Sequence, residues 1–267
     1  MSALELVTVR ATNPSTGAAG LAVTGNSLIV RDTPKRVWMS GLWQTRTADG
    51  NTQIVSPLLH DNLVGIQMRS EAGQYVGFSS MKTPMFAQDQ LSVTLIGSAA
   101  AEEHSSWLNY YESLPGVDAN LITYAELMRR AVDITAVLNT VTPGTTAFGT
   151  QVAINATNDQ LKANTEYAII GATIEDGVAT IGTHAIRYTG TDFGNLGVGL
   201  PGSAIYPGSN AQSFEWFMRL ARQLDLPMIP VFNSANKALT FLDAIGAAAT
   251  STGVATTLVR LAPQARK

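Results

Sequence analysis

The chain contains no cysteine among its 267 residues, which excludes disulfide bonds, thiolate chemistry and zinc sites with cysteine ligands. Charge is also scarce, because Asp, Glu, Lys and Arg make up only 14% of the sequence, against about 25% in an average soluble protein. The net charge is −3 and the only basic tail is Arg266-Lys267, so electrostatics gives no strong signal for nucleic-acid binding. Much of the surface must be Ser, Thr, Asn, Gln, Gly and Ala, which suits packing against copies of the same chain.

Long apolar runs are missing as well. The longest, such as residues 167–172, are far shorter than the roughly 20 residues that a membrane-spanning helix needs. The first residues, Met-Ser-Ala-Leu-Glu-Leu, have no basic start followed by an apolar core, so we expect no secretory signal and no transmembrane segment. The sequence leaves contact with a membrane surface open.

One glycine string, Gly197, Gly199 and Gly202, fits the spacing G-x-G-x-x-G. That motif binds a dinucleotide only where a helix begins directly after it, so that the helix N-terminus faces the pyrophosphate. Here Pro201 lies inside the string, and the next helical pattern begins only near residue 210. We therefore interpret the string as a surface loop and disfavour the alternative of a dinucleotide-binding loop.

The histidines His60, His104 and His184 are not spaced as ligand pairs on a helix, so we interpret them as isolated surface or interface residues. A pH switch at an interface is the functional alternative. The acidic residues Glu102-Glu103, Glu175-Asp176 and Asp89 fall in or beside predicted loops. Such acids could hold calcium between subunits, but solvated loop carboxylates are the commoner case. We predict no catalytic, cofactor-binding or metal site.

Alternation of apolar and polar residues dominates the pattern and predicts antiparallel sheet with one face on a core. Residues 64–68 and 91–95 alternate clearly, and residues 134–138 alternate less cleanly. In the last of these, Ile134, Ala136 and Leu138 are expected to face the core. The dipeptides Gly25-Asn26, Asp49-Gly50 and Asp176-Gly177 separate predicted strands and favour tight hairpin turns. Residues 102–113 begin like a helix, but Trp107, Tyr110 and Tyr111 favour a strand.

Two helices are predicted. Ser209 to Gln212 forms a capping box, and Phe214, Phe217, Leu220 and Leu224 recur at helical spacing before Pro227. A shorter linker helix is expected over residues 124–131, with Glu126 and Arg130 spaced for an i,i+4 ion pair. Arg129-Arg130 is interpreted as a solvated helix face, with a contact to nucleic acid as the alternative.

Tryptophans offer a further test of the strand pattern. Trp38 and Trp43 lie in one predicted strand at an odd separation, so we expect them on opposite faces. Trp216 lies off the apolar stripe of its helix, and we expect it to be partly buried, at the edge of a sandwich or against a neighbour. We also expect the segment 194–209 and the helix 210–224 to lie at a subunit contact or a domain edge.

One pattern occurs twice. Residues 91–114 and residues 238–263 each read as a strand, a Gly-Ala-rich bend, a second strand and a proline. A repeat about one domain length apart indicates a single β module used twice. We therefore predict a mainly β fold of two antiparallel sandwich or jelly-roll modules, over residues 1–117 and 118–267, with roughly seven or eight strands each.

With its repeated closing hairpin, its late helix and its Ser/Thr/Asn/Ala/Gly-rich surface, the chain resembles viral coat proteins of the jelly-roll class. Its length is similar to that of the double jelly-roll major capsid proteins of tailless bacteriophages. The resemblance implies a trimer of pseudo-hexagonal outline that tiles an icosahedral shell, since two modules per chain make six per trimer.

We therefore expect a self-assembling capsid subunit, not an enzyme, that associates with itself and with other virion proteins in the virion. Two alternatives remain: a decoration or spike protein of a virion, and a carbohydrate-binding or hydrolytic β-sandwich. Hydrolysis would need paired carboxylates on either side of a cleft.

Overall fold

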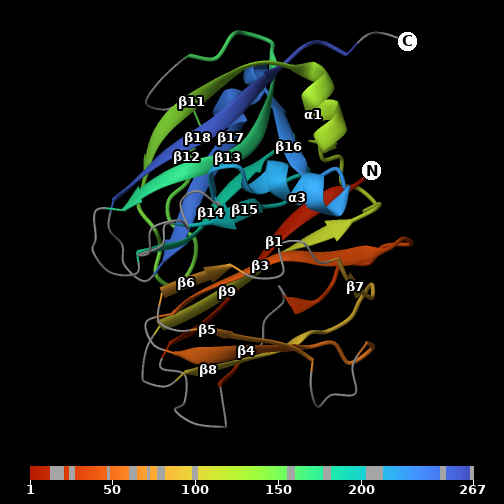
Figure 1. The fold of residues 1–267 in the computed structure, drawn as a ribbon, viewed down its shortest axis with the longest axis vertical. Helices are drawn as coiled ribbons and strands as arrows, with labels where there is room; N and C mark the ends of the chain where they lie inside the picture. Colours follow the sequence, from red (N-terminus) through yellow and green to blue (C-terminus); the bar gives the residue numbers. More distant parts are fainter. Residues whose placement is uncertain are drawn as a thin grey trace.

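The computed structural model describes residues 1–12, 21–23, 28–46, 49–59, 65–70, 73–76, 82–97, 102–154, 160–176, 182–202, 213–246 and 251–264. The fold is mainly β and antiparallel, with one sandwich stacked on another (Figure 1). No helix in these ranges is both long and apolar enough to cross a membrane.

The N-terminal sandwich consists of two sheets. One has the order β1 (Ala3–Thr12), β9 (Glu102–Tyr111), β3 (Val37–Arg46), β6 (Gly73–Val76), with β7 (Thr83–Met85) also paired to β3. The facing sheet has the order β2 (Leu21–Val23), β8 (Ser92–Gly97), β4 (Gly50–Val55), β5 (Ile66–Ser70). Side chains such as Val7, Trp107 and Val93 from both sheets form one buried cluster.

The C-terminal sandwich has the same plan. One sheet has the order β10 (Leu121–Ile122), β16 (Ile229–Asn233), β13 (Glu166–Asp176), β18 (Thr252–Leu261), β11 (Ala131–Val141). The facing sheet has the order β12 (Val152–Ala153), β17 (Thr240–Gly246), β14 (Thr183–Gly190), β15 (Val198–Pro201). Helix α1 (Tyr124–Arg130) precedes β11, helix α3 (Trp216–Leu224) lies between β15 and β16, and the 3-10 helix η2 (Ser234–Leu239) precedes β17.

Both sandwiches have the strand order of a jelly roll. Because β6 and β7 pair with different parts of β3, they act as one interrupted strand. With β10 left aside, each described half then has eight strands, in the orders first–eighth–third–sixth and second–seventh–fourth–fifth. All strand pairing in the described ranges stays within one half. The boundary at residue 117 remains our own division of the chain.

The repeated closing strands are confirmed as β8 and β9 and again as β17 and β18, but they are not hairpins. β8 pairs with β2 and β4, whereas β9 pairs with β1 and β3 in the opposite sheet. The hairpins expected at Asp49-Gly50 and Asp176-Gly177 are wrong for the same reason, because each lies between strands of different sheets. Gly25-Asn26 lies outside the described residues. A jelly roll crosses between its sheets, and consecutive described strands pair only at β4–β5 and β14–β15.

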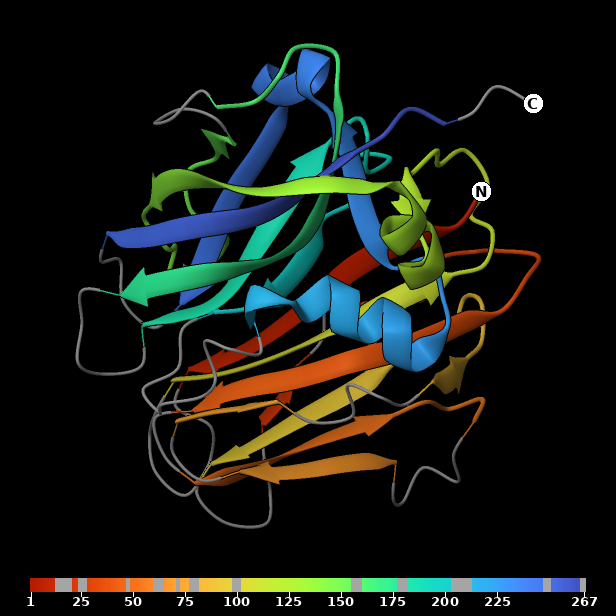
Figure 2. The same ribbon diagram turned by 45° about the horizontal axis from the view of Figure 1, so that its top comes forward.

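The two sandwiches share a buried junction. Residues 103–111 of β9 are all buried, which requires cover on both faces of the sheet. Trp107 and Tyr111 point into the N-terminal core, while Leu108 and Tyr110 join the core cluster of the C-terminal sandwich. Figure 2 shows α3 lying between the C-terminal sandwich and the sheet that contains β3. The two faces of β9 therefore contribute side chains to two hydrophobic cores, one in each sandwich.

A β-bulge in β3 overturns the prediction for the tryptophans. The register shifts between Ser40 and Trp43, and Gly41 has a φ of +58°, which glycine adopts without strain. The extra residue inverts the alternation, so Trp38 and Trp43 both pack against the C-terminal cluster. They lie on one face, not on two.

Candidate functional site

Two histidines meet at the junction. The rings of His104 on β9 and His184 on β14 stack at a centroid distance of 5.0 Å, although the residues lie far apart in sequence. Both are buried. His184 is fixed by two hydroxyls: Thr45 Oγ1 lies 2.7 Å from Nδ1, and Ser106 Oγ lies 2.7 Å from Nε2. The interpretation of His104 and His184 as isolated surface or interface residues is wrong, because the two rings stack on each other inside the chain. His60 lies outside the described residues.

The junction keeps these imidazoles uncharged. Burial, with a contribution from Arg10, lowers the pKa of His104 from 6.5 to about 3. Burial, with a contribution from His104, holds the pKa of His184 well below its usual value. The Nε2 atom of His104 has no hydrogen-bond partner in the described part of the chain, so its protonation would bury an N–H without an acceptor. The pair is a structural site that acid can disturb.

Trp216 lies at the centre of the same junction. It is fully buried, and its ring meets Trp43 edge-on at 5.5 Å. A Cβ atom on Gly41 would lie 2.8 Å from the Trp216 ring, which is why the close approach of β3 to α3 needs glycine. Helix α3 is covered on two sides, so Trp216, which lies off the predicted apolar stripe, is buried. Phe214, which was predicted to belong to the stripe, is exposed. The capping box at residues 209–212 lies outside the described residues.

The glycine string spans the buried strand β15 of this junction and is not a surface loop. Gly199 belongs to β15, which is buried along its length. The Leu6 N–H of β1 donates to the Gly197 carbonyl at 2.6 Å, and a Cβ on Gly199 would lie 2.5 Å from the Leu6 side chain. The glycines therefore allow two sandwiches to approach closely. β15 and α3 lie at an edge between modules, as expected for this part of the chain.

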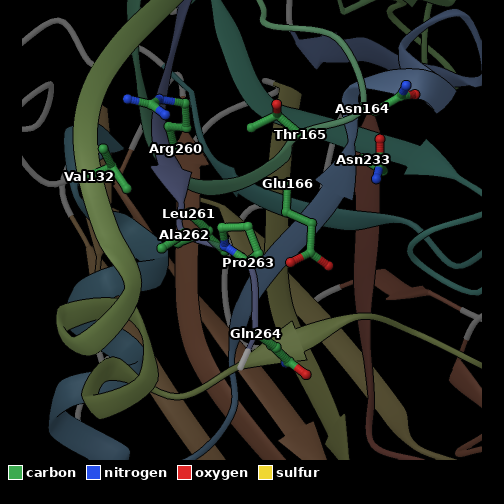
Figure 3. A pocket seen from close by; sticks show the side chains of 10 residues that line it. All are labelled: Val132, Asn164, Thr165, Glu166, Asn233, Arg260, Leu261, Ala262, Pro263 and Gln264. Atoms are coloured by element: carbon green, nitrogen blue, oxygen red, sulfur yellow. The ribbon is translucent and has the colours of Figure 1, made fainter. Parts of the chain in front are cut away.

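A polar cavity of about 530 Å³ opens where β13, β16 and the end of β18 meet (Figure 3). Its ten lining residues are Val132, Asn164, Thr165, Glu166, Asn233, Arg260, Leu261, Ala262, Pro263 and Gln264. Both charged side chains are already paired, Glu166 with Arg130 and Arg260 with Asp133 at 2.5 Å. The cavity offers amide and hydroxyl groups but no nucleophile–base pair and no aromatic platform, so its geometry supports neither hydrolysis nor stacking on a sugar.

Arg130 lies behind this cavity and binds Glu166, one of its lining residues. Its side chain is 3% exposed and donates to Glu126 at 3.0 Å, to Glu166 and to the Ala262 carbonyl at 3.0 Å. The predicted i,i+4 pair with Glu126 is confirmed, but the solvated helix face is wrong for Arg130. Arg129, 65% exposed, fits that description. Arg130 thus fixes α1 to β13 and to the segment after β18.

Replacing Arg130 with methionine is expected to lower the free energy of unfolding by about 2–3 kcal/mol, because two partly buried carboxylates lose their hydrogen-bonded cation. Chemical denaturation measures this difference. Arg129→Met is the matched control and should change stability by less than about 0.5 kcal/mol. Equal effects of the two substitutions would contradict the anchoring role of Arg130.

Two of the acidic residues that were predicted to be solvated loop carboxylates are buried. Asp89 is buried and accepts a hydrogen bond from the Ser56 hydroxyl, and Glu103 is buried in β9. Glu175 and Asp176 end β13, and Glu102 begins β9. No group of three or more potential metal ligands gathers within the described ranges. Glu103 is buried because β9 begins at Glu102, where the sequence pattern predicts a loop. Asp89 lies between β7 and β8 and is held there by the Ser56 hydroxyl.

The most unusual surface lies along β11. This strand is the outer edge of its sheet, yet Ile134 is 68% exposed and Leu138 51%. The prediction that Ile134, Ala136 and Leu138 face the core is wrong, because Val137 and Val141 occupy the inward positions. β11 carries apolar residues on both faces, and one face has no cover in the described structure. We call Ile134, Ala136 and Leu138 the β11 row.

Comparison with known proteins adds little to this geometry. No family model and no curated protein matches the chain. Among solved structures, the PBSX exported protein XepA is 10% identical, with 96% of this chain and 86% of that chain covered and a TM-score of 0.28. A cupin 2 conserved barrel domain protein from Leptotrichia buccalis is 8% identical (96% and 89% covered, TM-score 0.19). The major capsid protein P2 of bacteriophage PM2 is 9% identical (99% and 99%, TM-score 0.23). Scores this low carry no argument about function.

Proposed function

We propose that this protein is a self-assembling structural subunit of a virion, the coat protein of its shell. The observation that carries the proposal is the repeated jelly roll, with the same strand order in both described halves of the chain. A chain with two similar modules gives six modules in a trimer, and a six-module tile fills a hexagonal lattice with few distinct contacts. Jelly rolls are a recurrent architecture of viral capsids.

The junction between the sandwiches supports this role. A shell subunit must keep its shape while neighbours press on it, and a module joint with few contacts would flex. Here Leu4, Trp43, Leu108 and Tyr110 of the N-terminal half belong to the same buried cluster as the C-terminal core. The two modules therefore behave as one block, which can present fixed contact surfaces to neighbouring copies.

The low surface charge and the β11 row support self-association in particular. Charged residues make up 14% of the chain, and uncovered apolar side chains on a sheet edge favour contact with another chain. The polar cavity of Figure 3 presents no catalytic arrangement, so a hydrolytic β-sandwich has less support. A decoration or spike protein of a virion would share the fold but differ in its abundance in the particle.

Purification of the full chain followed by sedimentation velocity tests the proposal. We expect concentration-dependent assembly into trimers and larger closed species. In virions that contain the protein, a coat subunit should be the most abundant band on a denaturing gel, whereas a minor band would indicate decoration or spike. A chain that stays monomeric at every accessible concentration would contradict the proposal.

A further inference from the structure

We infer that the β11 edge is a two-fold contact, in which β11 pairs antiparallel with β11 of a second copy of this chain. The inference rests on the proposed self-assembly and names one of its contacts. It begins from the position of the strand, which is lime green at the outer edge of the C-terminal sandwich in Figures 1 and 2. β11 pairs with β18 on one side and has no strand on the other in the described structure.

Length sets β11 apart from most sheet edges of the molecule. It has eleven residues, whereas β2, β5, β6, β10, β12 and β15 have five or fewer. β1, the other long edge strand, has ten residues, but its Leu6 N–H is bonded to Gly197 and none of its described side chains is exposed. A long open edge presents a row of backbone donors and acceptors that another strand can satisfy.

The side chains on this edge lack the features that usually prevent pairing. Natural edge strands are protected by lysine, proline or inward charge, and β5 shows exposed Gln67 and Arg69. The β11 row has none of these. Four of the ten exposed large hydrophobic side chains described in the chain lie on α1 and β11, at Met128, Val132, Ile134 and Leu138.

Charge does not oppose a second copy. Asp133 is the single charged residue of β11, and Arg260 of β18 binds its carboxylate with Nε at 2.9 Å. The pKa of Asp133 is lowered by this hydrogen bond, so the pair stays ionised and neutral overall. Two β11 strands therefore meet without net repulsion.

The sequence of the row fits its own copy. With the two-fold axis at Ala136, Ile134 lies opposite Leu138 of the second copy and Ala136 lies opposite itself. Directly opposed side chains in antiparallel strands contact one another, so the two large apolar groups cover each other. This register places Asp133 opposite Asn139 of the second copy, so the two acidic groups do not face each other. Moving the two-fold axis by one residue, to Val137, would set Ile134 against the polar Thr140, which disfavours that register.

The absence of cysteine makes a direct test possible, since a single introduced thiol has no native competitor. In Ala136→Cys, two copies of the same position should oxidise to a disulfide under copper–phenanthroline and air, because opposed Cα atoms lie about 4.5–5.5 Å apart in such pairs. Thr140→Cys is the matched control. Its thiol would not face its own copy, so it should stay monomeric on a non-reducing gel. Mixed Ile134→Cys and Leu138→Cys chains should form the heterodimer.

A second pair of variants tests the apolar contact. Ile134→Lys should weaken self-association at least tenfold, because two ammonium groups would be buried beside apolar side chains. Leu239→Lys, at a side chain exposed to a similar degree on η2, should leave it unchanged. Neither substitution should reduce thermal stability by much, since both side chains are exposed.

The outcomes separate this inference from the proposed function. Assembly of the wild type with no cross-link above the Thr140→Cys background, or assembly unaffected by Ile134→Lys, would overturn the β11 contact and leave the shell function standing. A cross-linked Ala136→Cys dimer from a chain that never forms larger species would support the contact and contradict the shell. A monomeric wild type without a cross-link would overturn both.

Discussion

Replacing Trp216 with alanine is expected to lower the free energy of unfolding by about 3–5 kcal/mol, the range for truncating a large buried aromatic residue. The indole is fully buried between α3 and the bulge of β3, and its removal leaves a cavity lined by Trp43 and Leu220. Neither sandwich can collapse into that space without losing its own packing. Denaturant unfolding followed by tryptophan fluorescence and circular dichroism measures the loss.

Two controls sharpen this test. Trp216→Phe should cost much less than alanine, because it keeps most of the volume and removes a buried indole N–H that has no acceptor in the described part of the chain. Trp38→Ala, on the same face of β3 but only partly buried, should cost less than half as much as Trp216→Ala. An alanine variant of Trp216 as stable as the wild type would show that the junction does not hold the two modules together.

Acid is expected to destabilise the protein through the buried histidine pair. His104 has a pKa of about 3 when folded and about 6.5 when unfolded, so the unfolded chain binds more protons between these values. Stability therefore rises with pH in this window and is lost as the pH falls from about 6.5 toward 3. Each such histidine contributes about 1.4 kcal/mol per pH unit. His184, whose pKa is also depressed, acts in the same direction.

Urea unfolding over a series of pH values measures this slope. His104→Gln should reduce the slope between pH 5 and pH 4 by about 1.4 kcal/mol per unit, because one titrating group is removed. All other titrating groups are the same in both proteins, so they form a common background. A slope that His104→Gln leaves unchanged would contradict the claim that His104 is held neutral in the folded protein.

Local pattern was enough to predict the repeated strands. The β9 strand followed from Trp107, Tyr110 and Tyr111, and the linker helix from the spacing of Glu126 and Arg130, because these signals act over a few residues. The fold class followed from the repetition of such signals. The pairing partner of each strand could not be predicted from such signals. Tight-turn dipeptides predict hairpins, whereas the chain crosses between sheets.

The junction and the uncovered face of β11 depend on contacts that no local pattern encodes. His104 and His184 come from different sandwiches, so their stacking requires the junction. Gly41 inserts a bulge that reverses the alternation of β3, and nothing in the spacing of Trp38 and Trp43 reveals it. In β11, apolar residues occupy both faces, so alternation alone could not decide which face is inward. In the described structure Val137 and Val141 fill the core, which leaves the face with Ile134 and Leu138 uncovered.

Negative-stain electron microscopy of the purified full-length protein at high concentration is the most direct test that this chain builds a shell. We expect trimeric rings and closed particles for the wild type. Ile134→Lys should lose the closed particles, because these need the two-fold β11 contact between trimers, and Leu239→Lys should keep them. A field of single, monomer-sized objects for the wild type at every concentration would contradict self-assembly into a shell.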